Sequence, residues 1–348
     1  MPIVRSKAPL RVSFAGGGTD VSPYPEEQGG AVLNCTIDKF AYATLSVREE
    51  GAGAVQVHSL DYNLTANYER ADDLVYNGEL DLVKAALKVL RPPGEDGASG
   101  RSYELFLHSD APPGTGLGSS STMSVAIVGA FQQYLKEPWT AYDVAELAYR
   151  IEREELGVKG GRQDQYAAAF GGFNFMEFNG RTTIVNPLRI APDVLNELAY
   201  RLLLCYTGTS HYSNDLIERQ QASYAEKRPG TVEALDATKR LAIDMKNELL
   251  RGRIDEMGKL LDEGWQLKKQ FTDGISNPRI DDFYAKARAS GALGGKLVGA
   301  GGGGYILLFC DYERRANVAK AVTAAGGRVV DFALEPAGLR SWVVRSAS

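Results

Sequence analysis

The stretch Pro-Pro-Gly-Thr-Gly-Leu-Gly-Ser-Ser-Ser-Thr occupies residues 112–122 of this 348-residue chain. It follows a run typical of a β-strand and opens an apolar run typical of a buried helix. Its glycines let the backbone approach a bulky anion closely, and its serines fall where a helix leaves its first N–H groups unpaired. The stretch therefore predicts a phosphate-binding loop, which is typical of an enzyme that uses a nucleotide. The alternative is a tight turn capped by serine. Three glycines and three serines within residues 114–121 disfavour it.

Two other glycine segments, residues 16–18 and 299–304, could also face a phosphate or a substrate. The second contains G-x-G-x-x-G, but a strand-like run follows it at residues 305–310, where the dinucleotide-binding motif requires a helix. The P-loop pattern G-x-x-x-x-G-K-[ST] does not occur, and neither do the protein-kinase signatures. The sequence thus excludes the commonest nucleotide-binding motifs and leaves residues 112–122 as the candidate.

The composition is that of an ordinary globular protein, with 44% hydrophobic and 24% charged residues and a formal net charge of −5. The negative charge gives no reason to expect a nucleic-acid or membrane-surface partner. The N-terminal residues lack the apolar core of a signal peptide, and residues 305–310 are too short to span a bilayer. We therefore expect a cytoplasmic enzyme with no membrane or nucleic-acid partner, and the sequence leaves a homo-oligomer open.

Neither the cysteines nor the histidines show the spacing of a metal site. Cys35, Cys205 and Cys310 lie in or beside apolar strand-like runs, so we expect small buried hydrophobic side chains in a reducing compartment. The three histidines, His58, His108 and His211, are scattered along the chain and receive no ligand role.

Hydrophobic periodicity predicts an α+β fold, because the strands cluster rather than alternate regularly with helices. The expected strands are residues 10–15, 41–47, 55–59, 103–108, 202–206, 305–310, 328–334 and 340–344. The expected helices are residues 81–90, 121–135, 140–156 and 318–325, with a helix-rich region at residues 232–271 and a loop at 92–100. A change in composition near residue 190 suggests two domains, residues 1–190 and 191–348.

Three motifs in the same order resemble those of the GHMP kinase superfamily, which includes galactokinase, homoserine kinase and mevalonate kinase. The first is Ala-Pro-Leu-Arg-Val-Ser-Phe-Ala-Gly-Gly-Gly-Thr-Asp at residues 8–20, the second is residues 112–122, and the third is Lys-Leu-Val-Gly-Ala-Gly-Gly-Gly-Gly at residues 296–304. Together they span residues 8–304. The resemblance implies a ribosomal protein S5 domain 2-like N-terminal domain and a ferredoxin-like C-terminal domain.

The first motif departs from galactokinase and is closer to the heptose 7-phosphate kinases of bacteria. Leu10 replaces the usual glycine, and Gly17 and Gly18 replace the usual Glu-His pair. The segment Gly-Gly-Arg-Gln-Asp-Gln-Tyr at residues 160–166 also resembles those kinases. This resemblance implies a kinase that phosphorylates the anomeric hydroxyl of a sugar already carrying a distal phosphate.

The resemblance also assigns catalytic, nucleotide and metal residues. Asp164 matches the aspartate that orients the sugar hydroxyl, and Arg11 matches the basic residue beside it. ATP would bind the loop residues Pro113, Gly114, Thr115, Gly116, Leu117, Gly118, Ser119, Ser120 and Ser121. Ser120 and Glu152 would hold Mg²⁺, with Glu154 and Glu155 as competing choices for the carboxylate.

The substrate residues form a third set. Gly17, Gly18, Thr19, Asp20, Gln163, Gly301 and Gly302 are expected around the sugar. Arg162 and Lys7 are expected to hold the distal phosphate, with Lys159 as a weaker candidate. His211 or Tyr212 lies where heptose kinases often carry an arginine, which leaves the exact sugar open.

Three alternatives remain at this point. A kinase for an unphosphorylated sugar such as fucose or galactose would bear the same motifs. A decarboxylase of this fold is disfavoured by the Thr-Asp pair at residues 19–20, and a non-catalytic sugar sensor would be expected to have lost Asp164, Arg11 or the serine motif. An assay of ATP consumption over sugars with and without a terminal phosphate separates these readings.

Overall fold

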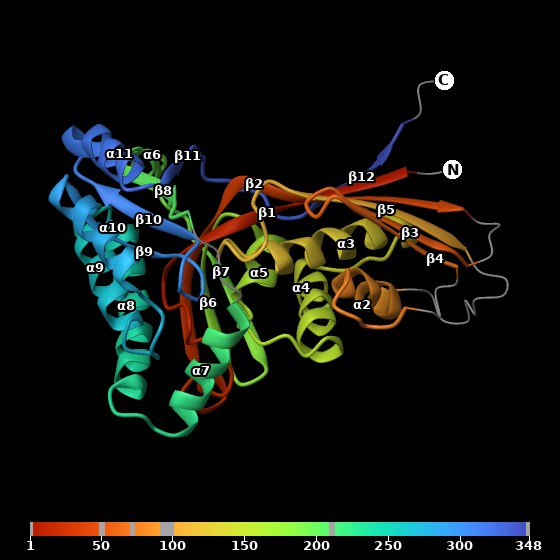
Figure 1. Cartoon of the computed structure of the whole chain (residues 1–348), viewed down its shortest axis with the longest axis horizontal. Helices are drawn as coiled ribbons and strands as arrows, with labels where there is room; N and C mark the ends of the chain where they lie inside the picture. Colours follow the sequence, from red (N-terminus) through yellow and green to blue (C-terminus); the bar gives the residue numbers. More distant parts are fainter. Residues whose placement is uncertain (1–2, 49–52, 70–73, 91–100, 209–212, 346–348) are drawn as a thin grey trace.

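The computed structural model describes residues 3–48, 53–69, 74–90, 101–208 and 213–345. These residues form two sheets with helices packed against them, one in each lobe of the molecule (Figure 1). The α+β fold class with two lobes is confirmed.

The first sheet has eight strands in the described residues and carries the N-terminal half of the chain. Its main path runs β12-β1-β2-β5-β3-β4, and β2 also pairs with β6, which pairs with β7. The strands are β1 (Ile3–Ala15), β2 (Gly30–Arg48), β3 (Val55–Ser59), β4 (Leu64–Tyr68), β5 (Ser102–Ser109), β6 (Phe173–Asn179), β7 (Thr182–Pro187) and β12 (Arg340–Val344). All pairings are antiparallel except that of β3 with β5.

Helices cover one face of this sheet, beneath it in Figure 1. They are α2 (Asp81–Leu90), α3 (Ser119–Leu135), α4 (Ala141–Tyr149), the π-helical turn η2 (Arg150–Glu155) and α5 (Gln163–Phe170). Helix α3 is buried on nearly all sides, as its apolar sequence predicts. Helix α4 begins at the expected Thr140, whose hydroxyl accepts a hydrogen bond from the backbone N–H of Asp143 in a capping box.

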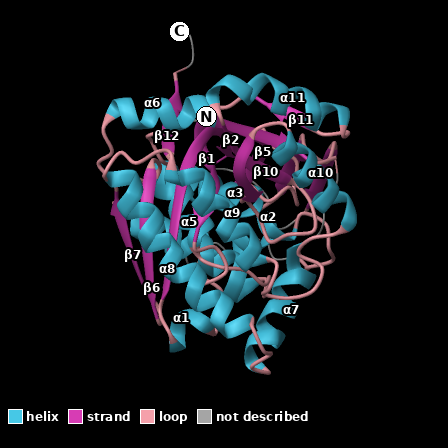
Figure 2. Cartoon of the chain, turned by 90° about the vertical axis from the view of Figure 1, so that its left-hand side faces the viewer, coloured by secondary structure: helices cyan, strands magenta, loops and turns pink. Residues whose placement is uncertain are grey.

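The second sheet has the order β11-β8-β10-β9 and is antiparallel. Its strands are β8 (Leu202–Tyr206), β9 (Ala292–Leu297), β10 (Tyr305–Cys310) and β11 (Arg328–Val330). The helices of this lobe are α6 (Pro192–Arg201), α7 (Ser213–Ala225), α8 (Thr231–Leu250), α9 (Glu256–Lys268), α10 (Pro278–Ala289) and α11 (Arg315–Ala324). Short turns at α1 (Tyr24–Glu27) and η3 (Tyr312–Arg314) complete the elements. Figure 2 shows α8 and the other helices of this lobe from the side.

One hydrophobic core joins the two lobes. It contains Leu10, Val12 and Phe14 of β1 together with Leu204 of β8 and Leu307 of β10, all fully buried. Protein interiors are packed as densely as organic crystals, so this shared core holds the ends of β1 and the second sheet in a fixed relation. The loops that follow these strands therefore meet at the junction of the lobes.

Several expected elements differ in extent from the observed ones. Strands β1 and β2 are longer than expected, and the expected strand at residues 328–334 is reduced to β11. Strands β4, β6 and β7 and helix α5 were not predicted, and the expected loop at residues 92–100 lies outside the described residues. The division of the chain near residue 190 stays a prediction, but β12 returns to pair with β1 in the first sheet.

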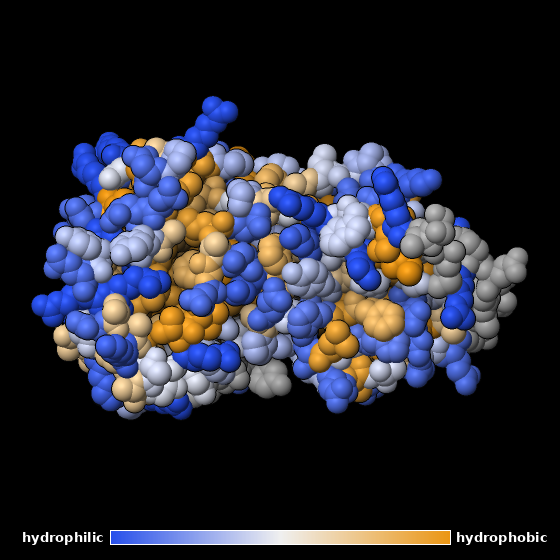
Figure 3. Space-filling view, turned by 90° about the horizontal axis from the view of Figure 1, so that it is seen from above, coloured by the Kyte–Doolittle hydropathy of each residue, from blue (hydrophilic) through white to orange (hydrophobic). Residues whose placement is uncertain are grey.

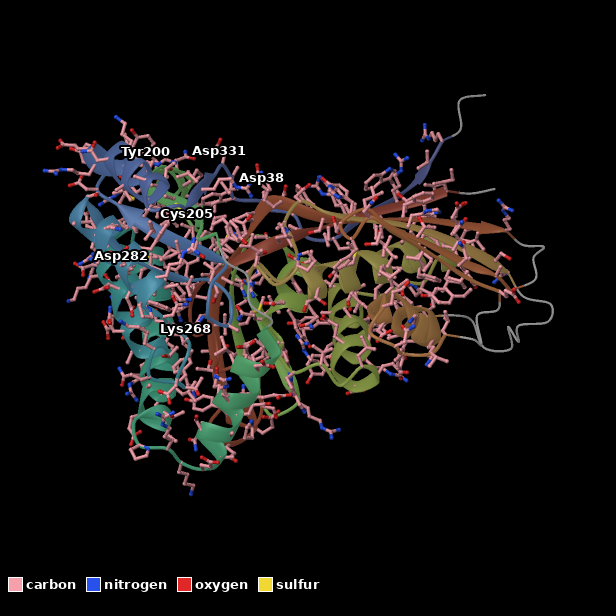
Figure 4. The ribbon with its side chains drawn as sticks, in the orientation of Figure 1. Asp38, Tyr200, Cys205, Lys268, Asp282 and Asp331 are labelled. Carbon is pink, nitrogen blue, oxygen red and sulfur yellow. The ribbon has the colours of Figure 1, made fainter. Side chains whose placement is uncertain are left out.

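The three cysteines are buried and free, as their apolar surroundings predict. Burial raises the pKa of the Cys205 thiol, in β8 (Figure 4), to about 12. Within the described chain, no helix is long and apolar enough to cross a bilayer. The surface seen from above is largely hydrophilic, with apolar patches between the charged groups (Figure 3).

Candidate active site

A cavity of about 330 Å³ lies at the junction of the two lobes. The three glycine segments of the sequence all contribute to its wall, together with the loop before α5 and the end of α9. From the expected site, it is lined by Arg11, Gly17, Gly18, Asp20, Pro113, Gly114, Gly116, Gly118, Ser119, Ser120, Ser121, Glu152, Lys159, Gln163 and Asp164.

Direct backbone contacts hold the three motifs together. The N–H of Arg11 donates to the Leu117 carbonyl at 3.2 Å, and that of Tyr305 donates to the Thr115 carbonyl at 3.0 Å. A Cβ on Gly116 would lie 2.8 Å from the Cα of Gly299, closer than real side chains approach, so glycine is required at this crossing. The first, second and third motifs thus form one structure.

The loop at residues 112–118 leads into α3, and the N-terminus of this helix has no side-chain cap. Gly118 is the N-cap residue in the left-handed region at φ 78°, and no side chain caps the helix. The N–H groups of the first turn are therefore available to an anion and carry the positive end of the helix dipole. Ser119 Oγ is buried and has no hydrogen-bond partner among the described residues, so the cradle also offers an unused hydroxyl. These features fit a nucleotide phosphate.

Arg11 and Asp164 form a bidentate ion pair in the cavity wall. The Arg11 Nε donates to Asp164 Oδ1 at 2.6 Å and Nη2 donates to Oδ2 at 2.9 Å. Arg11 is 4% exposed and its Nη1 also donates to the Gly116 carbonyl at 2.6 Å. A Cβ on Gly118 would lie 3.0 Å from Asp164 Oδ2, so the carboxylate rests against the start of α3. Asp164 sits in the first turn of α5.

Asp20 is the second carboxylate of the cavity. It accepts hydrogen bonds from the backbone N–H of Gly18 at 3.0 Å and of Gln163 at 3.1 Å. Burial raises the pKa of this carboxyl, and the charge of Asp164 raises it further, while the two backbone donors lower it. Asp20 thus fixes the first motif to the loop before α5 and presents oxygen acceptors to the cavity.

Ser120 and Glu152 lie side by side, as the expected metal pair requires. Ser120 Oγ donates to Glu152 Oε1 at 2.7 Å, and Gln165 Nε2 donates to Oε2 at 2.6 Å. Glu152 is 1% exposed and belongs to the π-helical turn, whereas Glu154 and Glu155 are exposed. Glu155 also accepts a hydrogen bond from Tyr76. One hydroxyl and one carboxylate beside a phosphate cradle fit Mg²⁺, which keeps several waters and phosphate oxygens as ligands.

Two lysines of the C-terminal lobe complete the cavity, and no motif had assigned a role to either of them. Lys268, at the end of α9, lies at the junction of the lobes (Figure 4), and Lys296 lies in β9. Lys268 appears in a helical run as a common surface residue, and only its burial distinguishes it. Lys296 was visible as the first residue of the third motif. The cavity wall also contains Ser13 of the first motif, which had no assigned role, and Ile217, Gln220 and Phe271, which no motif indicated.

Five of the expected site residues support the cavity without lining it. The Thr19 hydroxyl donates to the carbonyls of Gly16 and Ala31, so it is used within the first motif. Thr115 and Leu117 are buried, and their carbonyls accept the backbone hydrogen bonds described above, from Tyr305 of the second lobe and Arg11 of the first. Gly301 and Gly302 pack on Ile275, whose carbonyl accepts a hydrogen bond from the Gly302 N–H. None of these five residues lines the cavity in the described structure.

The expected distal-phosphate residues lie elsewhere, with one exception. Arg162 donates to the Gly180 carbonyl at 2.8 Å and pairs with Glu26, and Lys7 lies over the Phe40 ring on the first sheet. Neither lines the cavity, because β1 carries Lys7 away from the junction and α1 and β6 engage Arg162. Lys159 does line it. His211 and Tyr212 lie outside the described residues.

Two family models match this chain. The GHMP kinases N-terminal domain matches residues 81–172, and the GHMP kinases C-terminal domain matches residues 245–328. The first match includes the phosphate cradle, Glu152 and Asp164, and the second includes Lys268 and the third motif.

Full-length relatives agree with these matches. The chain is 39% identical over 343 residues to the D-glycero-alpha-D-manno-heptose 7-phosphate kinase of Campylobacter jejuni, covering 98% of this chain and 99% of the relative. It superposes with a TM-score of 0.80 and 35% identity on a D-glycero-D-manno-heptose 1-phosphate kinase from Bacteroides thetaiotaomicron, covering 99% and 100% of the two chains. Lactococcus lactis galactokinase complexed with galactose, at 17% identity and a TM-score of 0.76, covering 97% of this chain and 95% of that one, shares the fold. The chain belongs to the GHMP kinase family and is a phosphotransferase that acts on an alcohol group.

Proposed function

We propose that this protein transfers the γ-phosphoryl group of ATP to the anomeric hydroxyl of a heptose 7-phosphate or a closely related sugar phosphate. The observation that carries the proposal is the part-buried Arg11–Asp164 pair, at 2.6 and 2.9 Å, beside the open N-terminus of α3. A carboxylate next to a phosphate cradle can hold a hydroxyl in line with the phosphorus atom that it attacks.

Asp164 is the residue that orients the attacking hydroxyl and accepts its proton. The Arg11 guanidinium fixes the two oxygens of the Asp164 carboxylate, because a planar donor pair matches a carboxylate. The same guanidinium is close enough to the phosphate loop, through its bond to the Gly116 carbonyl, to stabilise charge on the moving phosphoryl group. Asp20 is the acceptor for hydroxyls of the sugar ring.

ATP is held by the loop at residues 112–121 and Mg²⁺ by Ser120 and Glu152 in this proposal. A bound Mg²⁺ would neutralise charge on the phosphate oxygens. Gln165 holds the second oxygen of Glu152, so the first oxygen and the serine hydroxyl stay directed to the same side. We also infer a cytoplasmic location, where ATP is available and the three cysteines stay reduced.

Similarity to the heptose 7-phosphate kinase of Campylobacter jejuni supports the choice of substrate. The proposed contact for the distal phosphate is Lys159, because it is exposed and lines the cavity next to Gly160 and Gly161. A Cβ on Gly161 would lie 1.9 Å from Asp20 Oδ2, so this segment and the sugar-binding aspartate touch. A sugar bound at Asp20 therefore has Lys159 near its far end.

The test is ATP consumption over a panel of sugars, each with and without a terminal phosphate. The proposal predicts turnover with heptose 7-phosphate and at least tenfold lower kcat/KM with the unphosphorylated heptose, because a charge-assisted contact contributes roughly 1.5–3 kcal/mol. Lys159→Gln should reduce this preference, whereas Lys39→Gln, on the first lobe outside the cavity, should not. Turnover with fucose or galactose and none with a sugar phosphate would instead favour the unphosphorylated substrate.

A further inference from the structure

Two lysine side chains are buried in the cavity wall without a counter-ion. Lys268 is 7% exposed and Lys296 is 4% exposed. Lys268 Nζ donates to the carbonyls of Leu297 and Gly299, and Lys296 Nζ donates to the carbonyl of Ser13 at 2.9 Å. Neither ammonium forms an ion pair with a carboxylate of the described residues. Each ammonium has three N–H donors, so the bonds described leave one free on Lys268 and two on Lys296.

Such an arrangement is costly in a protein without ligand. Taking an ammonium out of water costs several kcal/mol, and carbonyl oxygens return only part of it. The two lysines also repel each other and Arg11. Burial, then the charge of Arg11, lowers the pKa of Lys268 to about 7, while Asp20 raises it. Burial, then Lys268 and Arg11, lowers the pKa of Lys296.

The charges that face Lys268 come from three other elements. They are Arg11 of β1, Lys296 of β9 and Asp20 of the first motif. The Arg11 charge is already matched by Asp164 through two hydrogen bonds. Among the described residues that act on Lys268, Asp20 is the one carboxylate left to balance the two ammonium groups, and its raised pKa reduces the negative charge that it supplies. The cavity wall therefore carries excess positive charge that its own side chains do not neutralise.

The position of these lysines relates them to the phosphate loop. Lys268 is bonded to the Gly299 carbonyl, and Gly299 makes the close backbone crossing with Gly116. Lys296 is bonded to β1 two residues beyond Arg11. Both ammonium groups thus face the junction of the phosphate loop, Arg11 and Asp164 from the C-terminal lobe. An attacking oxygen held by Asp164 lies about 3–3.5 Å from the phosphorus atom, so the transferring group must also sit there.

We propose that Lys268 and Lys296 form a phosphate-binding subsite contributed by the C-terminal lobe, and that it holds the phosphoryl group in transfer. The inference rests on the proposed function for the identity of the donor. Binding of the phosphoryl group supplies the missing counter-charge. Because the two lysines belong to the second lobe and Arg11 and Asp164 to the first, the subsite is complete only when the lobes are docked.

The first experiment measures thermal unfolding of Lys268→Met with and without a non-hydrolysable ATP analogue and Mg²⁺. Removing an uncompensated buried charge should leave the unfolding temperature of the free protein unchanged or raised. The stabilisation by the ATP analogue should fall to less than half of the wild-type shift. Lys268→Arg should retain it, and Lys259→Met, exposed on the same helix, should behave as wild type. A free variant that unfolds at lower temperature and keeps the full analogue shift would show a purely structural lysine.

The second experiment separates the two phosphate groups of the reaction. A role at the transferring group predicts that Lys268→Met and Lys296→Met each lower kcat about tenfold or more, with little change in KM for the sugar phosphate. A rise confined to KM for the sugar phosphate would assign the subsite to the distal phosphate and overturn this assignment. The analogue shift does not depend on the sugar, so it tests the subsite even if the proposed sugar substrate is wrong.

Discussion

At the scale of single residues, the site separates two aspartates by their surroundings. Asp164 is bonded to a guanidinium at both oxygens, whereas Asp20 is bonded only to two backbone N–H groups and is buried. The first arrangement holds the carboxylate in a fixed direction. The second arrangement leaves Asp20 without a cationic partner, so its oxygens can accept hydrogen bonds from hydroxyl groups of a sugar. The proposed division of labour, proton acceptor and sugar acceptor, follows from these partners.

Asp164→Asn should retain the fold and lose activity. Its amide oxygen still accepts one hydrogen bond from Arg11, but the group no longer takes a proton from the sugar hydroxyl. We expect kcat to fall by roughly 10²–10⁴-fold with KM for ATP within about threefold of wild type. Steady-state kinetics measure this, with Asp244→Asn on the exposed face of α8 as the control. Near-normal turnover would remove Asp164 from the proposed chemistry.

The metal assignment has a matched pair of variants at positions two residues apart. Glu152→Gln removes the charge beside Ser120, so the Mg²⁺ concentration for half-maximal activity should rise about tenfold or more. Glu154→Gln removes an exposed charge and should leave the Mg²⁺ dependence unchanged. Titrations of activity with Mg²⁺ compare the two. A shift in the Glu154 variant alone would reverse the choice of carboxylate.

At the scale of elements, the turn that leads into α3 brings the phosphate loop into contact with the catalytic aspartate. Gly118 combines a left-handed backbone with direct contact to Asp164. Gly230, the residue before α8, has a similar φ of 86° but open space around the missing side chain. The two glycines therefore share the backbone requirement and differ in contact with the site.

Gly118→Ala and Gly230→Ala should each destabilise the protein by about 1–2 kcal/mol, because alanine is strained in the left-handed region. Only Gly118→Ala should also lower kcat, by pushing the Asp164 carboxylate away from the start of α3. Denaturant unfolding and kinetics on both variants measure the two effects. Equal loss of kcat in both variants would mean that stability, not contact with Asp164, controls the rate.

Local sequence signals predicted part of this architecture. The phosphate loop and α3 were predicted because the glycines, serines and apolar run are contiguous. Helix α5 was missed because it is short, begins without a side-chain cap and follows two glycines. Strands β6 and β7 were missed because their sequences contain Asn, Thr and Pro, and pairing with β2 provides most of their order. The catalytic residues were found through motifs rather than through these elements.

At the scale of the whole molecule, contacts between segments far apart in the chain decide which side chains reach the cavity. Arg162 stands next to Gln163, yet the neighbouring Gly180 carbonyl and Glu26 take its guanidinium. Lys268 is 104 residues from Asp164 and reaches the cavity only because the shared core docks the second lobe on β1. No local pattern reports such contacts. The sequence could therefore supply the chemistry of the first lobe but not its partner residues from the second.

The buried lysine also predicts how stability depends on pH. The folded-state pKa of Lys268, about 7, lies below its ordinary value of 10.5, so the unfolded chain binds more protons between these values. This group alone makes stability rise with pH from about 7 to 10.5, by at most about 1.4 kcal/mol per pH unit. In Lys268→Met that contribution is absent. The change in unfolding free energy between pH 7 and pH 9 should thus be smaller in Lys268→Met than in the wild type. The same change in both proteins would contradict the burial of the Lys268 ammonium.

The most direct test of the central claim is ³¹P–¹H correlation NMR of the product formed from ATP and heptose 7-phosphate. The account predicts a second phosphate coupled to the anomeric proton at C1, with the phosphate at C7 unchanged, and no such product from Asp164→Asn. A product phosphorylated at another carbon, or ATP hydrolysis without a new sugar phosphate signal, would contradict it.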